Sequence, residues 1–148
     1  PNASICFSDA AISLPYSPFE GHDFSKKILR LCWDELYTTY GLRTLDPHHD
    51  KFKGRSEGRL DQRQKARFRG MAWTWLLGHF ITAYLKCNPT RKDLGWIFIR
   101  PFNSHLRHGC LGGVAEYFDG IMPYRAHGDV LSATAHGELL RVLFEDLV

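Results

Sequence analysis

The chain has 148 residues, of which 44% are hydrophobic and 24% charged, and its formal net charge is +3 with neutral histidines. This length and composition fit one folded domain and exclude disordered, collagen-like and disulfide-scaffold proteins. The most apolar stretch, 71–85, is interrupted by polar residues and is shorter than the roughly 20 residues that cross a bilayer, so we expect no membrane partner. The modest net charge argues against nucleic acid as a partner.

The four cysteines are widely separated, at Cys6, Cys32, Cys87 and Cys110. No two of them have the close spacing of a zinc or redox motif, and the N-terminus does not resemble a secretory signal. We therefore expect reduced thiols and a cytoplasmic location.

Helical periodicity dominates the first part of the chain. A short helix is expected over 5–14, ended by Pro15, and a longer one over 23–41, where Gly41 offers a stop. The segment 66–87 carries apolar residues on every side of the helical turn, which is typical of a helix in a protein interior.

Two further helices complete the prediction. The pair Asn88-Pro89 indicates an N-cap with proline at the first helical position, and Pro101 should kink or restart that helix. A last helix is expected after Gly128-Asp129. Because no segment alternates with a period of two, the chain is predicted to be all-α, with four to five helices.

Two connections, 42–65 and 110–127, exceed the roughly 12–15 residues beyond which loops tend to be functional. The first loop and its exit carry eight basic and two acidic residues, a local charge of +6. These are Lys51, Lys53, Arg55, Arg59, Arg63, Lys65, Arg67 and Arg69 against Glu57 and Asp61. One interpretation is a phosphate-binding stripe with Phe52 and Phe68 as stacking groups, and the simpler one is a solvated charged loop.

No metal or other cofactor is expected. His105 and His108 are three residues apart, with His127, His136 and the pair at 48–49 elsewhere, but no cysteine or carboxylate completes a known ligand spacing. Interaction of histidines with the carbonyl groups at helix ends is the simpler explanation.

Trp73 and Trp75 flank Thr74 in the most apolar segment. Positions two apart point about 200° apart on a helix, so one indole is expected to face a cavity, where it offers a platform for a sugar ring or a cation. The alternative is that both rings are core residues.

The second loop carries Glu116 among glycines and apolar residues. Glycines let a backbone approach a ligand closely, and an apolar setting suits a carboxyl group that acts as general acid or base. The alternative is that Glu116 pairs with a nearby arginine.

Several segments, in their order along the chain, resemble one family. The segments are 40–45 (YGLRTL), 73–78 (WTWLLG), 115–120 (AEYFDG) and 138–141 (ELLR), with Gly54, Gly58 and Gly128 between them. Together they are similar to the C-terminal region of amylo-α-1,6-glucosidases, the glucosidase domain of glycogen debranching enzymes, over nearly the whole chain.

The resemblance implies that residues 1–148 form the C-terminal portion, about the last third, of a single (α/α)6 toroid. It further implies hydrolysis of α-1,6-linked glucose from branched α-glucan with inversion, with Glu116 as the general base. An inverting glycosidase also needs an acid, with the two carboxyl groups about 6.5–9.5 Å apart. The family's acid is an aspartate upstream of this chain, so the chain carries half of the catalytic pair.

The resemblance also places side chains around the glucose. Arg43, Trp73, Trp75 and Asp119 are expected near it. The chain starts at Pro1 without an initiator methionine, so we expect upstream sequence. Part of a toroid would expose apolar helix faces, which predicts association with the upstream part of the domain or with another copy.

The chain departs from the family pattern just before WTWLLG. Where the family has Arg-Asp-x-x-Tyr-His-Gln-Gly, residues 63–70 read RQKARFRG, so Gln64, Arg67, Phe68 and Arg69 replace four of its polar groups. Each lost partner of a buried sugar hydroxyl costs about 1–3 kcal/mol. The alternative function is therefore a non-catalytic, degenerate glucan-binding or interaction remnant of that domain.

Overall fold

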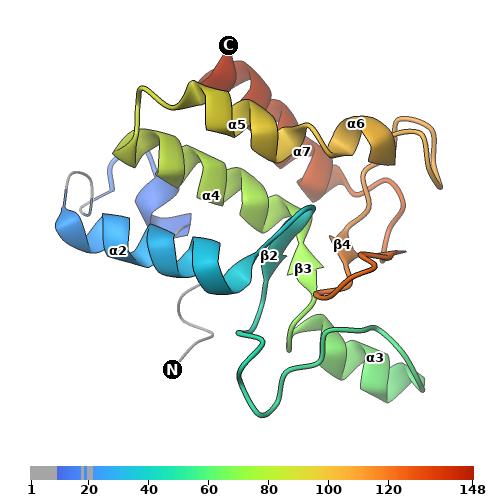
Figure 1. Ribbon diagram of the computed structural model, residues 1–148. Helices are drawn as coiled ribbons and strands as arrows, with labels where there is room; N and C mark the ends of the chain where they lie inside the picture. Colours follow the sequence, from blue (N-terminus) through green and yellow to red (C-terminus); the bar gives the residue numbers. More distant parts are fainter. Residues whose placement is uncertain (1–9, 18, 20–21) are drawn as a thin grey trace.

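The computed structural model describes residues 10–17, 19 and 22–148. Helix α4 (Thr74–Cys87) lies at its centre (Figure 1). Packed against α4 are α2 (Asp23–Leu31), α5 (Lys92–Ile99) and α7 (Ala133–Arg141). A short helix, α3 (Leu60–Arg67), lies apart from this group, beyond the sheet.

The interior position of α4, predicted from its apolar residues on every side, is confirmed. Phe80, Ile81 and Ala83 point in different directions around the helix, and each has 0% of its surface exposed. A helix in this position has to be covered on all sides, and the surrounding helices provide that cover.

A five-stranded antiparallel sheet lies at the N-terminal end of α4, so the all-α prediction is wrong in this respect. In spatial order the strands are β1 (Tyr37–Thr38), β2 (Gly41–Arg43), β3 (Ala72–Trp73), β4 (Tyr117–Phe118) and β5 (Ala126–His127). Strands of two or three residues are too short to show an alternating pattern, which is why the sequence did not reveal them.

The helix expected over 23–41 ends earlier than predicted. After α2 the chain continues through a π-helical turn, η2 (Cys32–Leu36), and then enters β1. The hydroxyl of Thr38 donates to the carbonyl oxygen of Gly41 at 2.7 Å, which holds the turn between β1 and β2. Pairing with the sheet therefore replaces the last helical turn.

The helix expected over 66–87 is divided into α3 and α4, with β3 between them. The break includes Gly70, whose φ of 137° is accessible to glycine but not to other residues without strain. The backbone NH of Gly70 donates to Thr44 Oγ1 at 2.9 Å, so the break is held against the residue that directly follows β2.

The break predicted at Pro101 is confirmed, because α5 ends before it and α6 (Phe102–His105) begins after it. The N-cap predicted at Asn88 is wrong. Asn88 instead ends α4, where its side-chain amide donates to the carbonyl oxygen of Tyr84 at 3.0 Å.

The last helix, α7, is capped by Ser132, whose hydroxyl accepts from the backbone NH of Ala135 at 3.4 Å. It continues as a second π-helical segment, η3 (Val142–Leu147). At the other end of the chain, residues 10–13 are helical and a turn follows at Pro15, while 5–9 lie outside the described residues.

Two further features concern the described residues. No helix among them has the length and apolar character needed to cross a membrane. Of the cysteines, Cys32, Cys87 and Cys110 take part in no disulfide, and Cys6 lies outside the described part.

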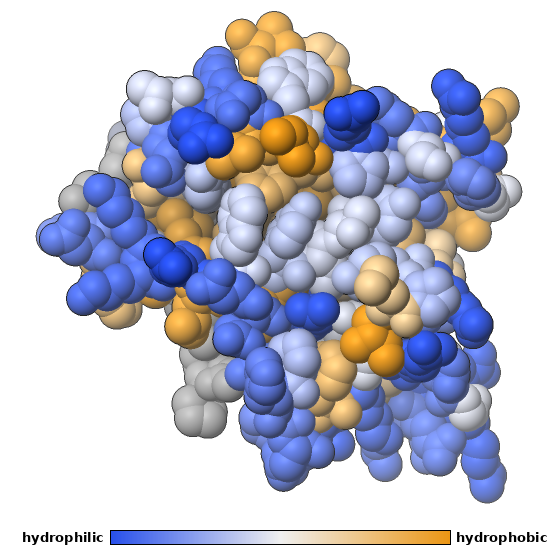
Figure 2. All heavy atoms as spheres, viewed as in Figure 1, coloured by the Kyte–Doolittle hydropathy of each residue, from blue (hydrophilic) through white to orange (hydrophobic). Residues whose placement is uncertain are grey.

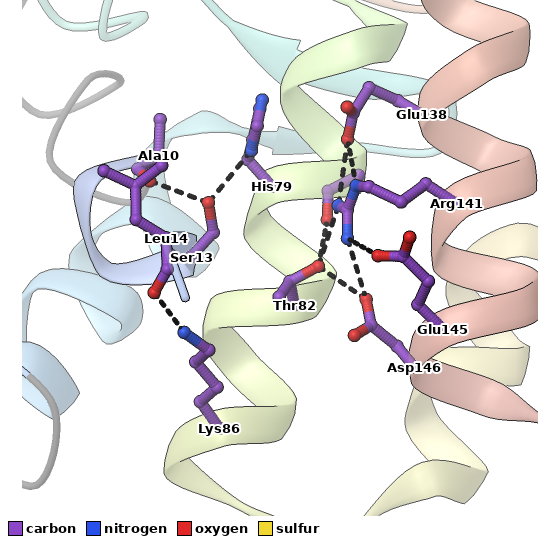
Figure 3. A network of polar contacts seen from close by, with 11 residues as sticks. Ala10, Ser13, Leu14, His79, Thr82, Lys86, Glu138, Arg141, Glu145 and Asp146 are labelled. Atoms are coloured by element: carbon purple, nitrogen blue, oxygen red, sulfur yellow. Dashed lines mark hydrogen bonds and ion pairs between the residues drawn. The ribbon is translucent and has the colours of Figure 1, made fainter. Parts of the chain in front are cut away.

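A network of polar side chains joins α7 and η3 to α4 (Figure 3). Arg141 donates to Thr82 Oγ1 and to Glu138 Oε2, each at 2.9 Å, and its other terminal nitrogen lies 3.4 Å from Asp146 Oδ2. Gly78 allows this approach, because a Cβ there would lie 2.7 Å from Glu138 Oε2. The network therefore sets how closely the two helices pack.

A second polar contact lies nearby on α4 (Figure 3). His79 Nδ1 is 2.9 Å from Ser13 Oγ, which itself donates to the carbonyl oxygen of Ala10 at 2.7 Å. Burial lowers the pKa of His79, and so does the positive charge of Arg141, against the opposing effect of Glu138. The imidazole therefore resists protonation in the folded chain.

Replacing Arg141 by methionine should lower the free energy of unfolding by about 1–3 kcal/mol, because two partly buried carboxylates lose their partner. Urea denaturation of the purified chain measures this change. As a control, Arg30→Met removes an exposed pair with Asp34 and should cost less than about 0.5 kcal/mol. Equal effects of the two substitutions would contradict a stabilising role of the Arg141 network.

The free energy of unfolding should also depend on pH through His79 and His105. Burial lowers the pKa of His105, as does His108, so the unfolded chain binds more protons than the folded chain below the usual value of about 6.5. These two histidines should therefore lower the free energy of unfolding as the pH decreases from about 7 to 5.5, whereas His48, whose pKa is raised by Asp46, contributes in the opposite direction. Denaturation curves at several pH values measure this effect. In His79→Asn the free energy of unfolding should decrease less over this pH range. An identical dependence on pH in both proteins would refute the role of His79.

Candidate functional site

Four rings form a row along one edge of the structure, and we call them the aromatic row: Phe68, Trp73, Tyr117 and His127. Cross-strand register pairs Trp73 with Tyr117 and Tyr117 with His127. Their ring centroids lie 5.2 and 5.7 Å apart, and the Phe68 ring stacks on Trp73 at 6.0 Å. The sheet therefore assembles groups that are far apart in the sequence.

Glu116 immediately precedes β4 and lies beside this row. Its backbone NH donates to the carbonyl oxygen of Asp129 at 3.0 Å, which brings the segment after β5 alongside. Gly128 sits there with φ of 73°, and a Cβ at that position would lie 2.8 Å from the Cβ of Glu116. The glycine is required both by its backbone conformation and by the close approach of the glutamate side chain.

The carboxylate of Glu116 forms an ion pair with Arg67, the last residue of α3. Arg67 Nη2 donates to Glu116 Oε1, and the backbone NH of Asp129 donates to Oε2 at 3.3 Å. The side chains of Arg67 and Glu116 are 35% and 17% exposed. Pairing with an arginine, the alternative that the sequence left open for Glu116, is thus present.

Arg67 is also held by two rings of the aromatic row. Its guanidinium carbon lies 5.1 Å from the ring centroid of Trp73 and 5.2 Å from that of Tyr117, within the range of cation–π attraction. The indole NH of Trp73 donates to the carbonyl oxygen of Arg67 at 2.9 Å. Arg67 Nε is buried and has no hydrogen-bond partner among the described residues.

Asp119 lies at the far end of the row and is 1% exposed. Its Oδ1 is 2.7 Å from His127 Nε2 and accepts from the backbone NH of Ser56 at 3.1 Å. It therefore orients the imidazole of His127 and fixes the basic loop against the sheet.

The remaining two predicted site residues lie elsewhere. Arg43 donates from Nε to the carbonyl oxygen of Gly120 at 2.6 Å and from Nη1 to that of Glu35 at 3.0 Å, so it ties β2 to the loop after β4. Trp75 lies on the first turn of α4, where its ring meets that of His79 edge-on at 5.7 Å. Of the predicted residues, Trp73, Glu116 and Asp119 are brought to the aromatic row, whereas Arg43 and Trp75 are not.

Three residues of this cluster were not predicted as site residues: Arg67, Tyr117 and His127. Arg67 appeared as one of eight cations and as a departure from the family pattern, and His127 only as a metal-ligand candidate. The signal that joins them is the strand register, which cannot be read from two-residue strands in a sequence.

A separate cavity of about 270 Å³ is lined in part by Tyr40, His105, Phe118 and Tyr124. Ala115 also lines it, and its backbone NH donates to His105 Nε2 at 3.1 Å. Glu116 is not among the lining residues, so its carboxylate does not project into this cavity.

One group of potential metal ligands converges among the described residues: Glu35, Asp46 and His48. His48 Nδ1 lies 3.0 Å from Asp46 Oδ1 and 3.2 Å from Glu35 Oε2. The hydrogen bond and the charge of Asp46 raise the pKa of His48, which fits an imidazolium between two carboxylates. The convergence is therefore explained without an ion.

The comparisons with known proteins agree with the resemblance seen in the sequence. The model of the amylo-alpha-1,6-glucosidase family matches residues 2–141, so the chain belongs to this family of glycoside hydrolases of the glycogen-debranching type. A search of curated proteins found no match.

A double-mutant cycle with Arg67→Gln and Glu116→Gln measures the strength of their pair. We expect a coupling energy of about 1–3 kcal/mol in the free energy of unfolding, because the pair is partly buried and held by two rings. The same cycle on the exposed Arg91–Asp93 pair, whose side chains are 50% and 59% exposed, should give about 0–1 kcal/mol. Coupling near zero between Arg67 and Glu116 would show that they do not pair in solution.

Proposed function

We propose that this chain binds branched α-glucan at the aromatic row without hydrolysing it, and that Glu116 serves as the partner of Arg67. The observation that carries this proposal is the Arg67–Glu116 ion pair. It is the non-catalytic alternative that the altered segment 63–70 suggested.

An inverting general base needs a carboxylate oxygen that faces a water molecule on one side of the sugar ring. In Glu116, Oε1 accepts from Arg67 and Oε2 accepts from the backbone NH of Asp129. Each oxygen can still accept a further hydrogen bond, so a water could bind there. A proton taken from that water, however, would neutralise Glu116 and leave the guanidinium of Arg67 between two rings without its counter-charge.

The residue that pairs with the carboxylate is itself one of the departures from the family pattern. Arg67 stands where the resemblance places a tyrosine, and the exposed Phe68 stands where it places a histidine. Both changes remove polar groups suited to sugar hydroxyls, and the first adds a cation beside the presumed base. We therefore expect these two substitutions to impair hydrolysis more than they impair glucan binding.

Binding of sugar rings is supported by the aromatic row. Phe68, the most exposed ring of the row at 69%, offers an apolar face to the CH-rich face of a hexose, whereas Tyr117 is 8% exposed and stacks on Trp73 and His127. His127, oriented by Asp119, offers such a polar group beside Tyr117.

A second candidate function is hydrolysis of α-1,6-linked glucose with inversion, with Glu116 as general base. It is favoured by the match of Glu116 to the family's base and by the partly buried position of its carboxylate. In that case the acid comes from the upstream part of an (α/α)6 toroid, of which this chain is the last third, and Arg67 swings away when glucan binds.

Glucose release from a branched dextrin by the full-length gene product separates the two functions. We expect binding of maltooligosaccharide in calorimetry but no release above background, and no change in Glu116→Gln. A release rate that falls about 10²–10⁴-fold in Glu116→Gln, and is unchanged in the exposed control Glu57→Gln, would establish hydrolysis instead.

A further inference from the structure

The segment 51–69 carries a concentration of unpaired positive charge. Of its eight basic side chains, Arg55 pairs with Glu57 and Arg67 with Glu116. The other six have no ion-pair partner among the described residues: Lys51, Lys53, Arg59, Arg63, Lys65 and Arg69. All six are exposed.

These cations are gathered by the fold. The backbone NH of Lys53 donates to the carbonyl oxygen of Arg69 at 2.6 Å, which brings the start of the basic segment to its end. Arg59 and Arg63 are four residues apart, so they lie on one side of α3. In Figure 1 this helix projects below the body, and Figure 2 shows hydrophilic side chains crowding that lower edge.

Like charges repel, and within this segment Glu57 and Asp61 offset only two of the eight basic charges. The rest of the chain has a net charge of −3, since the whole has +3 and this segment +6. A ligand that brings negative charge to α3 would relieve the repulsion.

The cationic surface is continuous with the aromatic row. Phe68 lies between Arg67 and Arg69 in the chain, is 69% exposed, and stacks on Trp73 at 6.0 Å. A polymer that lies on the exposed Phe68 would therefore also reach the cations beside it.

We propose that the ligand of this surface is an α-glucan that carries phosphate monoesters, a proposal that rests on glucan binding at the aromatic row. A neutral glucan offers the six cations no counter-charge, whereas a phosphate monoester carries about −1.5 to −2 at pH 7 and pairs well with arginine forks. Sugar rings occupy the aromatic row, and their phosphates lie on the exposed side of α3.

Affinity electrophoresis of the full-length protein in gels that contain phosphorylated amylopectin, or the same polymer after phosphatase treatment, tests this. We expect about tenfold tighter binding to the phosphorylated polymer at low salt, with the preference decreasing as salt is added. The double variant R59Q/R63Q should lose the preference and keep its binding to the dephosphorylated polymer. The control K26Q/K27Q removes two exposed charges from α2 and should keep the preference.

Three results would overturn the proposal. Equal binding to both polymers would remove the phosphate role and leave glucan binding intact. Absence of binding to either polymer would remove glucan binding as well. Tighter binding of single-stranded RNA, abolished by R59Q/R63Q, would identify the surface as a nucleic-acid site. Thermal melting of each variant, with a midpoint close to that of the unaltered protein, shows that the variants are folded.

Discussion

Helix α4 has apolar side chains on every side, and their burial is the constraint on which the other elements depend. Three helices have to surround α4 to exclude water from residues such as Phe80 and Ile81. Between α4 and α7 this enclosure is close enough to require Gly78 and the Arg141 network. Because β3 leads directly into α4, the burial of α4 also fixes the position of β3 and of Trp73 at its end.

The sheet then brings residues from distant parts of the chain to Trp73. Antiparallel pairing of three very short strands places Trp73, Tyr117 and His127 side by side. Arg67, at the end of α3, then reaches over two of these rings to the carboxylate of Glu116. In the family to which the chain belongs, this glutamate is the expected base, and here the geometry surrounds it with donors. The same residue type at the same place thus supports a structural role or a catalytic one, depending on its partner.

Charge is unevenly distributed along the chain, and this also has a structural basis. A segment that projects from the body, as α3 does, keeps its cations in water, where each costs little to maintain. Their concentration next to the exposed Phe68 is what distinguishes this surface from an ordinary solvated loop.

The sequence alone determined the interior position of α4, the break at Pro101 and membership of the glucosidase family, because these depend on local pattern and on ordered motifs. It also identified Glu116 and left two roles open for it. Only the tertiary structure decided that Arg67 is its partner, that Asp119 orients His127 and that Trp75 lies with His79. Residues 49 positions apart in the chain, like Arg67 and Glu116, meet through strand register, and strands of two residues leave no periodic signal from which that register can be read.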